Sequence, residues 1–329
     1  MLLLAVFALG IFIGSGANLF RGDVRKSSDV EQSALREGGF AFINPLLECE
    51  SNPELLASKE LKPFRAKINA LVERTQEAGA AENISVYFRD LNNGQWFGIN
   101  ETEKFSPANL LKIPVMIAYF KHAESSPQSL KKRLAFTAVE DWTQGQTIKP
   151  LRSMVRGKSY TVDNLIFRMI ADADTNAFQV LYTNLPPEQL KKVFTDLSVE
   201  YDPSVQDNTL SLNSYAAFLR VLYNASYLNR ELSEKALKLL SNSVFREGII
   251  AGTPPGVEIA SKFGERTIHV TDDESERDVK QLHDFGIIYF PKHPYLLGVV
   301  TRGKDFKELG KIIRDISHEV YDEVYRRSL

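Results

Sequence analysis

The chain has 329 residues, of which 43% are hydrophobic and 25% are charged, the composition of a globular protein with one large domain or two small ones. Its formal net charge of −2 gives no reason to expect a nucleic acid as partner. The single cysteine, Cys49, excludes an internal disulfide and a cysteine-based metal cluster, and the five histidines lack metal-ligand spacing. We therefore expect no metal and no cofactor.

Residues Leu2 to Phe20 form an almost wholly apolar run, which is followed by basic residues from Arg21 onward. A run of this length predicts a membrane anchor or the apolar region of a signal peptide within residues 1–20. Small residues in Ser15-Gly-Ala17 would suit cleavage and secretion, but a signal peptide usually has a basic residue before the apolar run, and none is present here. Against a simple anchor, the basic residues after the run lie on the side expected to be outside, contrary to the positive-inside rule. We favour an uncleaved anchor in the cell membrane, with the domain on the extracytoplasmic side. A secreted protein and a buried N-terminal helix are the alternatives.

Residues 21–51 are expected to be a linker and docking segment. The stretch from Asp23 to Gly39 is charged and contains Ser and Gly, whereas Phe40 to Leu47 is apolar and is expected to dock on the domain. The remaining residues, 52–329, are expected to form one domain.

The domain begins with an amphipathic helical pattern from Pro53 to Gly79. Two strand patterns follow, Ile84 to Leu91 and Gln95 to Ile99, on either side of Asn92-Asn-Gly94. Asn-Gly between alternating apolar residues predicts a β-hairpin.

The next segment, Leu110 to Phe120, is apolar on every side except for Lys112, which predicts a buried central helix. Because proline is tolerated only in the first turn, Pro114 places the helix start near Asn109, a residue type suited to an N-cap. Lys112 then lies on the first turn. A lysine at the end of a core helix is costly unless it has a partner or a task.

Helical patterns dominate from Glu124 to Asn242, with breaks at 143–159, 185–187 and 198–209. Strand patterns return at 257–263, 286–290 and 295–301, and a closing helix spans 305–327. The intervening stretch from Arg266 to Gln281 is interpreted as a charged surface insertion. Strands from the two ends of the chain must meet in one antiparallel sheet, with the helical block as a second lobe, so the fold class is α+β.

The run from Phe105 to Phe120 resembles the Ser-x-x-Lys helix of the serine β-lactamase and penicillin-binding protein superfamily, especially the class A form ending in Lys-Ile-Pro. In that family the serine three residues before the lysine is the acylated nucleophile. Here Asn109 replaces it. The resemblance spans residues 53 to 327 and implies a β-lactamase/transpeptidase-like fold, an antiparallel sheet flanked by helices plus an all-helical lobe, with a cleft between them.

The family's second motif, Ser-Asp-Asn, resembles Ala173-Asp174-Thr175, in which the relay hydroxyl is lost at Ala173. Asp174 also suits the N-cap of the helix that follows. The third motif, Lys-Thr/Ser-Gly, resembles Lys262-Phe263-Gly264, where the Phe263 ring would fill part of the site of the β-lactam carboxylate.

The class A deacylation sequence Glu-x-x-Leu-Asn is missing between Leu197 and Leu212, and Glu200 is interpreted as a solvated loop residue. Every hydroxyl that acyl transfer requires is thus replaced, and a nucleophile must lie within reach of its base. We favour a catalytically degenerate envelope domain that binds peptidoglycan peptide, a β-lactam-like ligand or an envelope protein. The alternatives are an active β-lactamase or D,D-peptidase that uses Ser106, and a structural envelope protein with a closed cleft.

Overall fold

A computed structural model describes residues 35–48, 61–201, 208–271 and 276–329. The apolar run from Leu2 to Phe20 and the start of the helix expected from Pro53 lie outside these ranges. Among the described residues, no helix is both long and apolar enough to cross a membrane.

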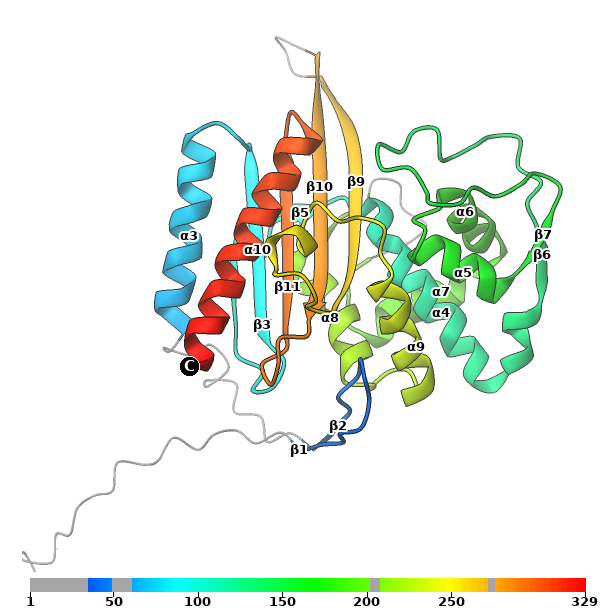
Figure 1. Cartoon of the computed structure of the whole chain (residues 1–329). Coiled ribbons are helices and arrows are strands. Elements are labelled where there is room, and N and C mark those ends of the chain that lie inside the picture. The colour runs from blue at the N-terminus through cyan, green and yellow to red at the C-terminus, as the bar shows by residue number, and fades with distance from the viewer. Residues whose placement is uncertain (1–34, 49–60, 202–207, 272–275) are drawn as a thin grey trace, which may run out of the picture. The chain divides into compact units, whose positions relative to one another are not determined.

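The centre of the domain is a five-stranded antiparallel sheet with the strand order β4-β3-β11-β10-β9 (Figure 1). Its strands are β3 (Asn83–Asp90), β4 (Trp96–Ile99), β9 (Ile259–Thr271), β10 (Glu276–Ile288) and β11 (Tyr295–Gly303). The early hairpin pairs with the late strands from Tyr295 opposite Asp90 to Arg302 opposite Asn83. The expected joining of strands from the two ends of the chain is confirmed.

The interpretation of Arg266 to Gln281 as a surface insertion is wrong. The described residues of this stretch, 266–271 and 276–281, form the outer halves of β9 and β10, which project beyond the rest of the sheet (Figure 1). The ladder pairs Gln281 with Arg266 and Glu276 with Thr271. Because this part of the hairpin packs little against the core, its side chains are charged and the apolar alternation that marks a half-buried strand is missing.

Side chains alternate between the two faces of the sheet, and each face has its own apolar core. On β11, Leu297 and Val299 belong to the core under helices α3 (Lys62–Glu77) and α10 (Phe306–Ser328). Leu296 and Val300 belong to the core shared with the helical lobe. The closing helix is confirmed, with Asp305 as its N-cap.

The helical lobe packs on the opposite face from α3 and α10 (Figure 1). Its helices are α4 (Lys112–Ser125), α5 (Val162–Ile170), α6 (Thr175–Asn184), α7 (Pro187–Asp196), α8 (Leu212–Tyr223) and α9 (Arg230–Ser241). Helix α4 is buried continuously from Lys112 to Phe120, as its all-round apolar character predicts. The α+β fold expected from the sequence is confirmed.

One part of the helical block was wrongly predicted. After α4 and a 3₁₀ turn, η3 (Pro127–Lys131), the chain forms a short strand, β6 (Arg133–Ala135), which pairs with β7 (Ser159–Thr161). A long loop, residues 136–158, connects them. Helix formation stops here because Pro127, the first residue of η3, lacks a backbone N–H and disfavours a helical conformation at Ser126.

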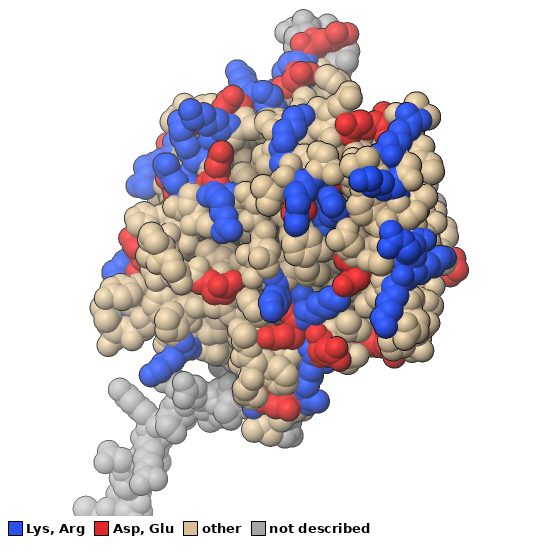
Figure 2. All heavy atoms as spheres, turned by 45° about the vertical axis from the view of Figure 1, so that its right-hand side comes forward, with Lys and Arg blue, Asp and Glu red and all other residues tan. Residues whose placement is uncertain are grey.

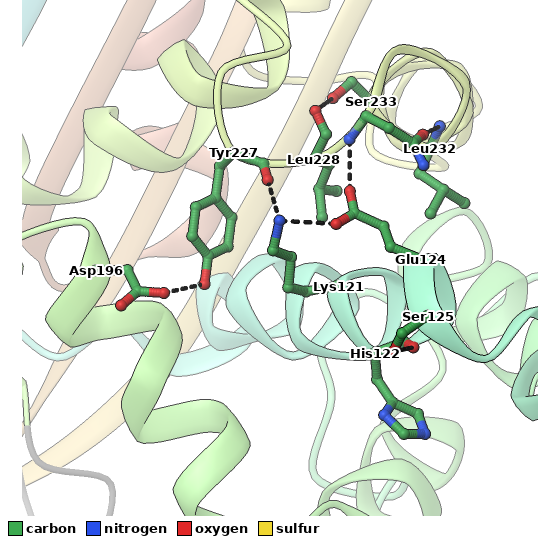
Figure 3. A network of polar contacts seen from close by, with 10 residues as sticks. Lys121, His122, Glu124, Ser125, Asp196, Tyr227, Leu228, Leu232 and Ser233 are labelled. Carbon is green, nitrogen blue, oxygen red and sulfur yellow. Dashed lines mark hydrogen bonds and ion pairs between the residues drawn. The ribbon is translucent and has the colours of Figure 1, made fainter.

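A polar network fixes the far end of α4 to two neighbouring segments (Figure 3). The Lys121 ammonium lies 2.7 Å from the Glu124 carboxylate and 2.7 Å from the carbonyl oxygen of Tyr227, which lies between α8 and α9. The Tyr227 hydroxyl donates to Asp196 on α7 at 2.7 Å. These groups hold helices together and contain no arrangement suited to catalysis.

The segment that precedes the domain docks against α9. Glu234 accepts hydrogen bonds from the backbone amides of Ala41, Phe42 and Ile43, and the Ile43 side chain is buried in the core of the helical lobe. The flanking short strands, β1 (Leu35–Arg36) and β2 (Leu46–Glu48), pair with each other. A carboxylate that accepts several backbone N–H groups is a strong, directional anchor.

Candidate functional site

Asn109 lies in a 3₁₀ turn, η2 (Ala108–Leu111), immediately before α4. Helix α4 begins at Lys112 rather than near Asn109, and the expected N-cap role of Asn109 is wrong because no side chain caps either element. Ala108 occupies the left-handed region, with φ of 46°, which directs the chain from the preceding strand into the turn. Pro114 still lies in the first turn of α4, as predicted.

Lys112 is completely buried at the N-terminus of α4. Its ammonium donates to the carbonyl oxygen of Ala173 at 2.9 Å and to the Thr175 hydroxyl at 3.3 Å. Burial and the nearby positive charge of Lys262 lower the pKa of Lys112 well below its ordinary value, while Asp174 and Glu265 oppose that shift. The structure therefore joins the first and second motifs through this lysine, as the family resemblance implies.

The second motif contributes its backbone more than its side chains. Ala173 is buried with φ of 59°, a left-handed conformation that turns its carbonyl oxygen toward Lys112. Asp174 is the N-cap of α6, as predicted, and accepts from the amides of Asn176 and Ala177 at 2.8 and 3.2 Å. Burial raises the pKa of the Asp174 carboxyl against these hydrogen bonds.

The third motif lies on β9, where Lys262 is also fully buried. Its ammonium donates to the carbonyl oxygen of Ile170 at 3.2 Å and lies 4.8 Å from the centroid of the Phe263 ring. Burial lowers the pKa of Lys262 to about 8, with Asp284 opposing that shift. The two lysines are therefore engaged by backbone carbonyls of the helical lobe, and among the described contacts the one hydroxyl that either ammonium reaches is that of Thr175.

Phe263 is fully buried and packs against Phe245, with ring centroids 4.7 Å apart. It belongs to the same buried apolar cluster as Ala173, so two of the substituted motif positions contribute apolar packing where the family has hydroxyls. Gly264 allows β9 to approach η2, because a Cβ atom there would lie 3.0 Å from Leu110 Cγ and 3.2 Å from the Pro107 carbonyl oxygen.

Sequence reasoning missed Asp284, which lies on β10 directly opposite Phe263. Its carboxylate accepts from the amide of Ile249 at 2.9 Å, and burial raises its pKa to about 7. Its charge interaction with Lys262 opposes the pKa shifts of both groups. The signal in the sequence was weak, since a single aspartate at a strand position does not show which charged groups lie near it.

The sequence predicted a break in the helical block at 143–159, but not that the loop of residues 136–158 bridges two of the motifs. The side-chain amide of Gln146 donates to the Ala173 carbonyl oxygen at 3.0 Å, and its oxygen accepts from the Thr175 amide at 3.3 Å. Two residues later, the Ile148 amide donates to Glu265 on β9 at 3.1 Å. The loop thus bridges the second motif and the edge strand, and Gln146 is itself buried.

Ser106, the alternative nucleophile, is held in a different environment. Its hydroxyl oxygen accepts from the Arg266 guanidinium at 2.6 Å, and its carbonyl oxygen is 3.2 Å from His283 Nε2. Burial lowers the pKa of His283 to about 3, so that ring is neutral, but it faces the carbonyl and not the hydroxyl. Arginine does not act as a base in proteins. Among the described contacts, Ser106 therefore has no general base.

No group of three potential metal ligands occurs among the described residues. Glu200 is exposed, as its loop position predicts. The site consists of Lys112, Ala173, Asp174, Thr175, Lys262, Phe263 and Gly264 with the additions Gln146, Glu265 and Asp284, and Asn109 lies beside it in η2.

The sheet, the helical lobe and the three converging motifs define a protein of the serine β-lactamase and penicillin-binding protein class. The sequence profile of the beta-lactamase enzyme family matches residues 63–324, and the chain belongs to that family. No curated protein matches the chain significantly.

Solved structures share the fold. A structure of PBP-A is 20% identical over 81% of this chain and 97% of its own, with a TM-score of 0.66. The β-lactamase from Sphaerobacter thermophilus is 20% identical over 77% of this chain and 95% of its own, with a TM-score of 0.65. A β-lactamase from Chitinophaga pinensis is 16% identical over 80% of this chain and 100% of its own, with a TM-score of 0.66. At these identities the comparisons establish the fold.

Proposed function

We propose that this chain is a catalytically inactive member of its family that acts at the cell envelope by binding a partner. The observation that carries the proposal is Asn109 at the position of the nucleophile. A carboxamide has no ionisable hydroxyl to attack an acyl carbon, so Lys112 has no proton to accept from it. The two hydrogen bonds that the Lys112 ammonium donates give this lysine a structural task instead.

The closed cleft supports an envelope protein as partner over a cell-wall peptide. A peptide bound between the second motif and β9 would have to displace the Gln146 amide and the contact between Ile148 and Glu265. It would also meet the buried Phe263 ring. One relative, PBP-A, has a structure described as an acyl-enzyme complex with penicillin G. A ligand in the corresponding place here would have to displace both the loop contacts and the Phe263 ring. For this reason a peptidoglycan peptide is the second candidate and an envelope protein the first.

Intact-protein mass spectrometry after incubation with penicillin G tests the first part of the proposal. The expected result is an unchanged mass, with an active class A β-lactamase as the positive control for acylation. An adduct of one penicillin that maps to Ser106 would establish the alternative hydrolase. Calorimetric titration with a cell-wall pentapeptide tests the second candidate, and we expect no binding heat. Saturable binding that Phe263→Thr strengthens would place the peptide in the cleft.

A further inference from the structure

The outer side of the loop of residues 136–158 exposes large apolar side chains. Val139 is 85% exposed, Trp142 42%, Leu151 71% and Val155 49%. All four lie on this one loop, and large exposed apolar groups that gather on a surface mark interaction sites, whereas scattered ones need no explanation.

The loop is held in one conformation, so these side chains are presented on a fixed framework. At its base, the Phe136 amide donates to the Lys158 carbonyl oxygen at 2.9 Å, and the Gly157 amide donates to the Phe136 carbonyl oxygen at 2.8 Å. Val139 lies three residues after Phe136, and Val155 lies three residues before Lys158. At its inner end, Gln146 is fixed to the second motif. The buried contact of Gln146 with the second motif thus also fixes the position of the exposed side of the loop.

Basic residues are interspersed with the apolar ones along this part of the chain. Between residues 131 and 158 the chain has seven basic residues and two acidic ones, in a protein whose formal net charge is −2. The basic residues, all exposed, are Lys131, Lys132, Arg133, Lys149, Arg152, Arg156 and Lys158. Arg152 pairs with the buried Asp172, but Lys131, Lys132, Arg156 and Lys158 form no ion pair with the described residues. Lys and Arg predominate on this side of the molecule in Figure 2.

The four exposed apolar residues of the loop and the basic residues between 131 and 158 are called the basic loop surface below. We infer that the basic loop surface docks on an anionic lipid membrane. Its positive charge requires an anionic partner, and its exposed tryptophan and aliphatic side chains require a partner that also has an apolar layer. Lipid interfaces offer both, since tryptophan favours the headgroup region and basic residues favour anionic lipid. A polyanion such as a nucleic acid would leave Leu151 and Val139 in water, and an acidic protein would have to supply its own apolar patch.

The fluorescence of Trp142 reports whether the loop contacts lipid. The chain has two tryptophans, and Trp96→Phe leaves Trp142 as the one fluorophore of this type in the full chain. The full-length protein is mixed with vesicles of phosphatidylcholine alone or of phosphatidylcholine and phosphatidylglycerol, and the vesicle-bound fraction is isolated by flotation. We expect a blue-shifted Trp142 emission that brominated lipid quenches in the anionic vesicles, and neither effect in the neutral ones. The N-terminal run and the basic residues from Arg21 onward can recruit the chain to anionic vesicles by themselves, so the emission and quenching of Trp142, and not the bound fraction, report contact by the loop.

Two variants test whether the surface itself makes the contact. Lys131→Glu with Arg156→Glu should weaken the Trp142 response to anionic vesicles by tenfold or more, because each basic residue near an anionic surface contributes about a factor of five. Lys304→Glu with Lys307→Glu, two exposed lysines outside this surface, is the matched control and should leave the response unchanged. Equal emission in both vesicle types, or equal effects of the two variants, would overturn the inference. A blue shift produced by soluble polyglutamate without lipid would also overturn it and favour an acidic protein partner.

Discussion

Gln146 and Lys112 donate to the same acceptor, the carbonyl oxygen of Ala173, at 3.0 and 2.9 Å. One hydrogen bond comes from the loop that closes the cleft and the other from the lysine that the family uses in catalysis. The shared acceptor means that the closed loop and the engaged lysine stabilise one arrangement of the second motif. Opening the cleft therefore costs more than moving a surface loop.

Removing the Gln146 side chain should loosen this closure. Gln146→Ala leaves the Thr175 amide without its acceptor and removes one donor from Ala173, so we expect a loss of about 1–3 kcal/mol in the free energy of unfolding. Hydrogen exchange should become faster in residues 141–149. Gln144→Ala is the control, because Gln144 is exposed and its contacts are made by its backbone. Equal exchange in the two variants would mean that Gln146 does not hold the loop.

Restoring the nucleophile alone should not restore an enzyme. Asn109→Ser returns a hydroxyl three residues before Lys112, but the motif positions that Ala173 and Phe263 occupy still have no hydroxyl. Catalytic groups that act as a unit are not additive. We expect at most slow acylation by penicillin in intact-mass measurements, and no turnover of a chromogenic cephalosporin.

Adding Ala173→Ser and Phe263→Thr to this variant should increase acylation, because the first returns a relay hydroxyl and the second removes a buried ring. The acyl-enzyme should persist, since no deacylation glutamate is present. Many turnovers by Asn109→Ser alone would show that the cleft retains more of the catalytic machinery than we infer. Complete resistance of the triple variant to labelling would show that the cleft stays closed.

Asp284 and His283 should make opposite contributions to the pH dependence of stability between about pH 4 and pH 7. Burial lowers the folded-state pKa of His283 to about 3, so in this range the unfolded chain binds a proton that the folded chain does not, and the His283 contribution rises with pH. Burial raises the folded-state pKa of Asp284 to about 7 from an ordinary value of 3.8, so in this range the folded chain retains a proton that the unfolded chain releases. This contribution is fully present below the unfolded pKa and is lost as the pH rises through the folded one, at about 1.4 kcal/mol per pKa unit. Asp284→Asn should remove the falling contribution and leave the rise from His283, so the free energy of urea unfolding should increase with pH more steeply than in the wild type, whereas Asp315→Asn, at an exposed position, should not change the slope. Parallel curves for the wild type and Asp284→Asn would refute this assignment.

Gly264→Ala should destabilise the domain by about 1–3 kcal/mol, because its Cβ atom would meet Leu110 and the Pro107 backbone at the closest approach of β9 to η2. Gly145→Ala is the control, since nothing lies within 4 Å of a Cβ atom there. Thermal unfolding of the two variants measures the difference. Similar melting temperatures would indicate that η2 can move away from the strand.

Protease treatment of intact spheroplasts tests the expected location. The apolar run from Leu2 to Phe20 motivates a tether that holds the domain outside the cell membrane. Added protease should then degrade the domain without lysis. A fully protected domain that is recovered with the cytosol would exclude this arrangement.

The sequence predicted those elements whose cause is local. Asn93-Gly94 predicted the β3–β4 hairpin, the all-round apolar run predicted α4, and Asp174 predicted the start of α6. The order of elements and the three motifs predicted the fold and the convergence of Lys112, Ala173 and Lys262.

The features that it could not predict depend on partners far away in the chain. Gln146 looks like an ordinary loop residue until Ala173, 27 positions later, is placed beside it. Ile148 reaches Glu265 across 117 positions. The start of α4 was misjudged because Asn109 has the right chemistry for an N-cap, whereas the approach of Gly264 and the left-handed Ala108 set the local backbone.

The long β9–β10 hairpin has a consequence for solubility. Among the described strands β9 lies at the edge of the sheet, where its free backbone groups could pair with the edge of another molecule. The outer half of this edge has Arg266 and His269, polar side chains that would lose hydration if the edge of a second molecule paired with it. The charges that concealed the strands from sequence interpretation are thus the ones that protect the exposed edge from aggregation. Replacing them with threonine or valine would make the strand easier to predict and the protein harder to keep in solution.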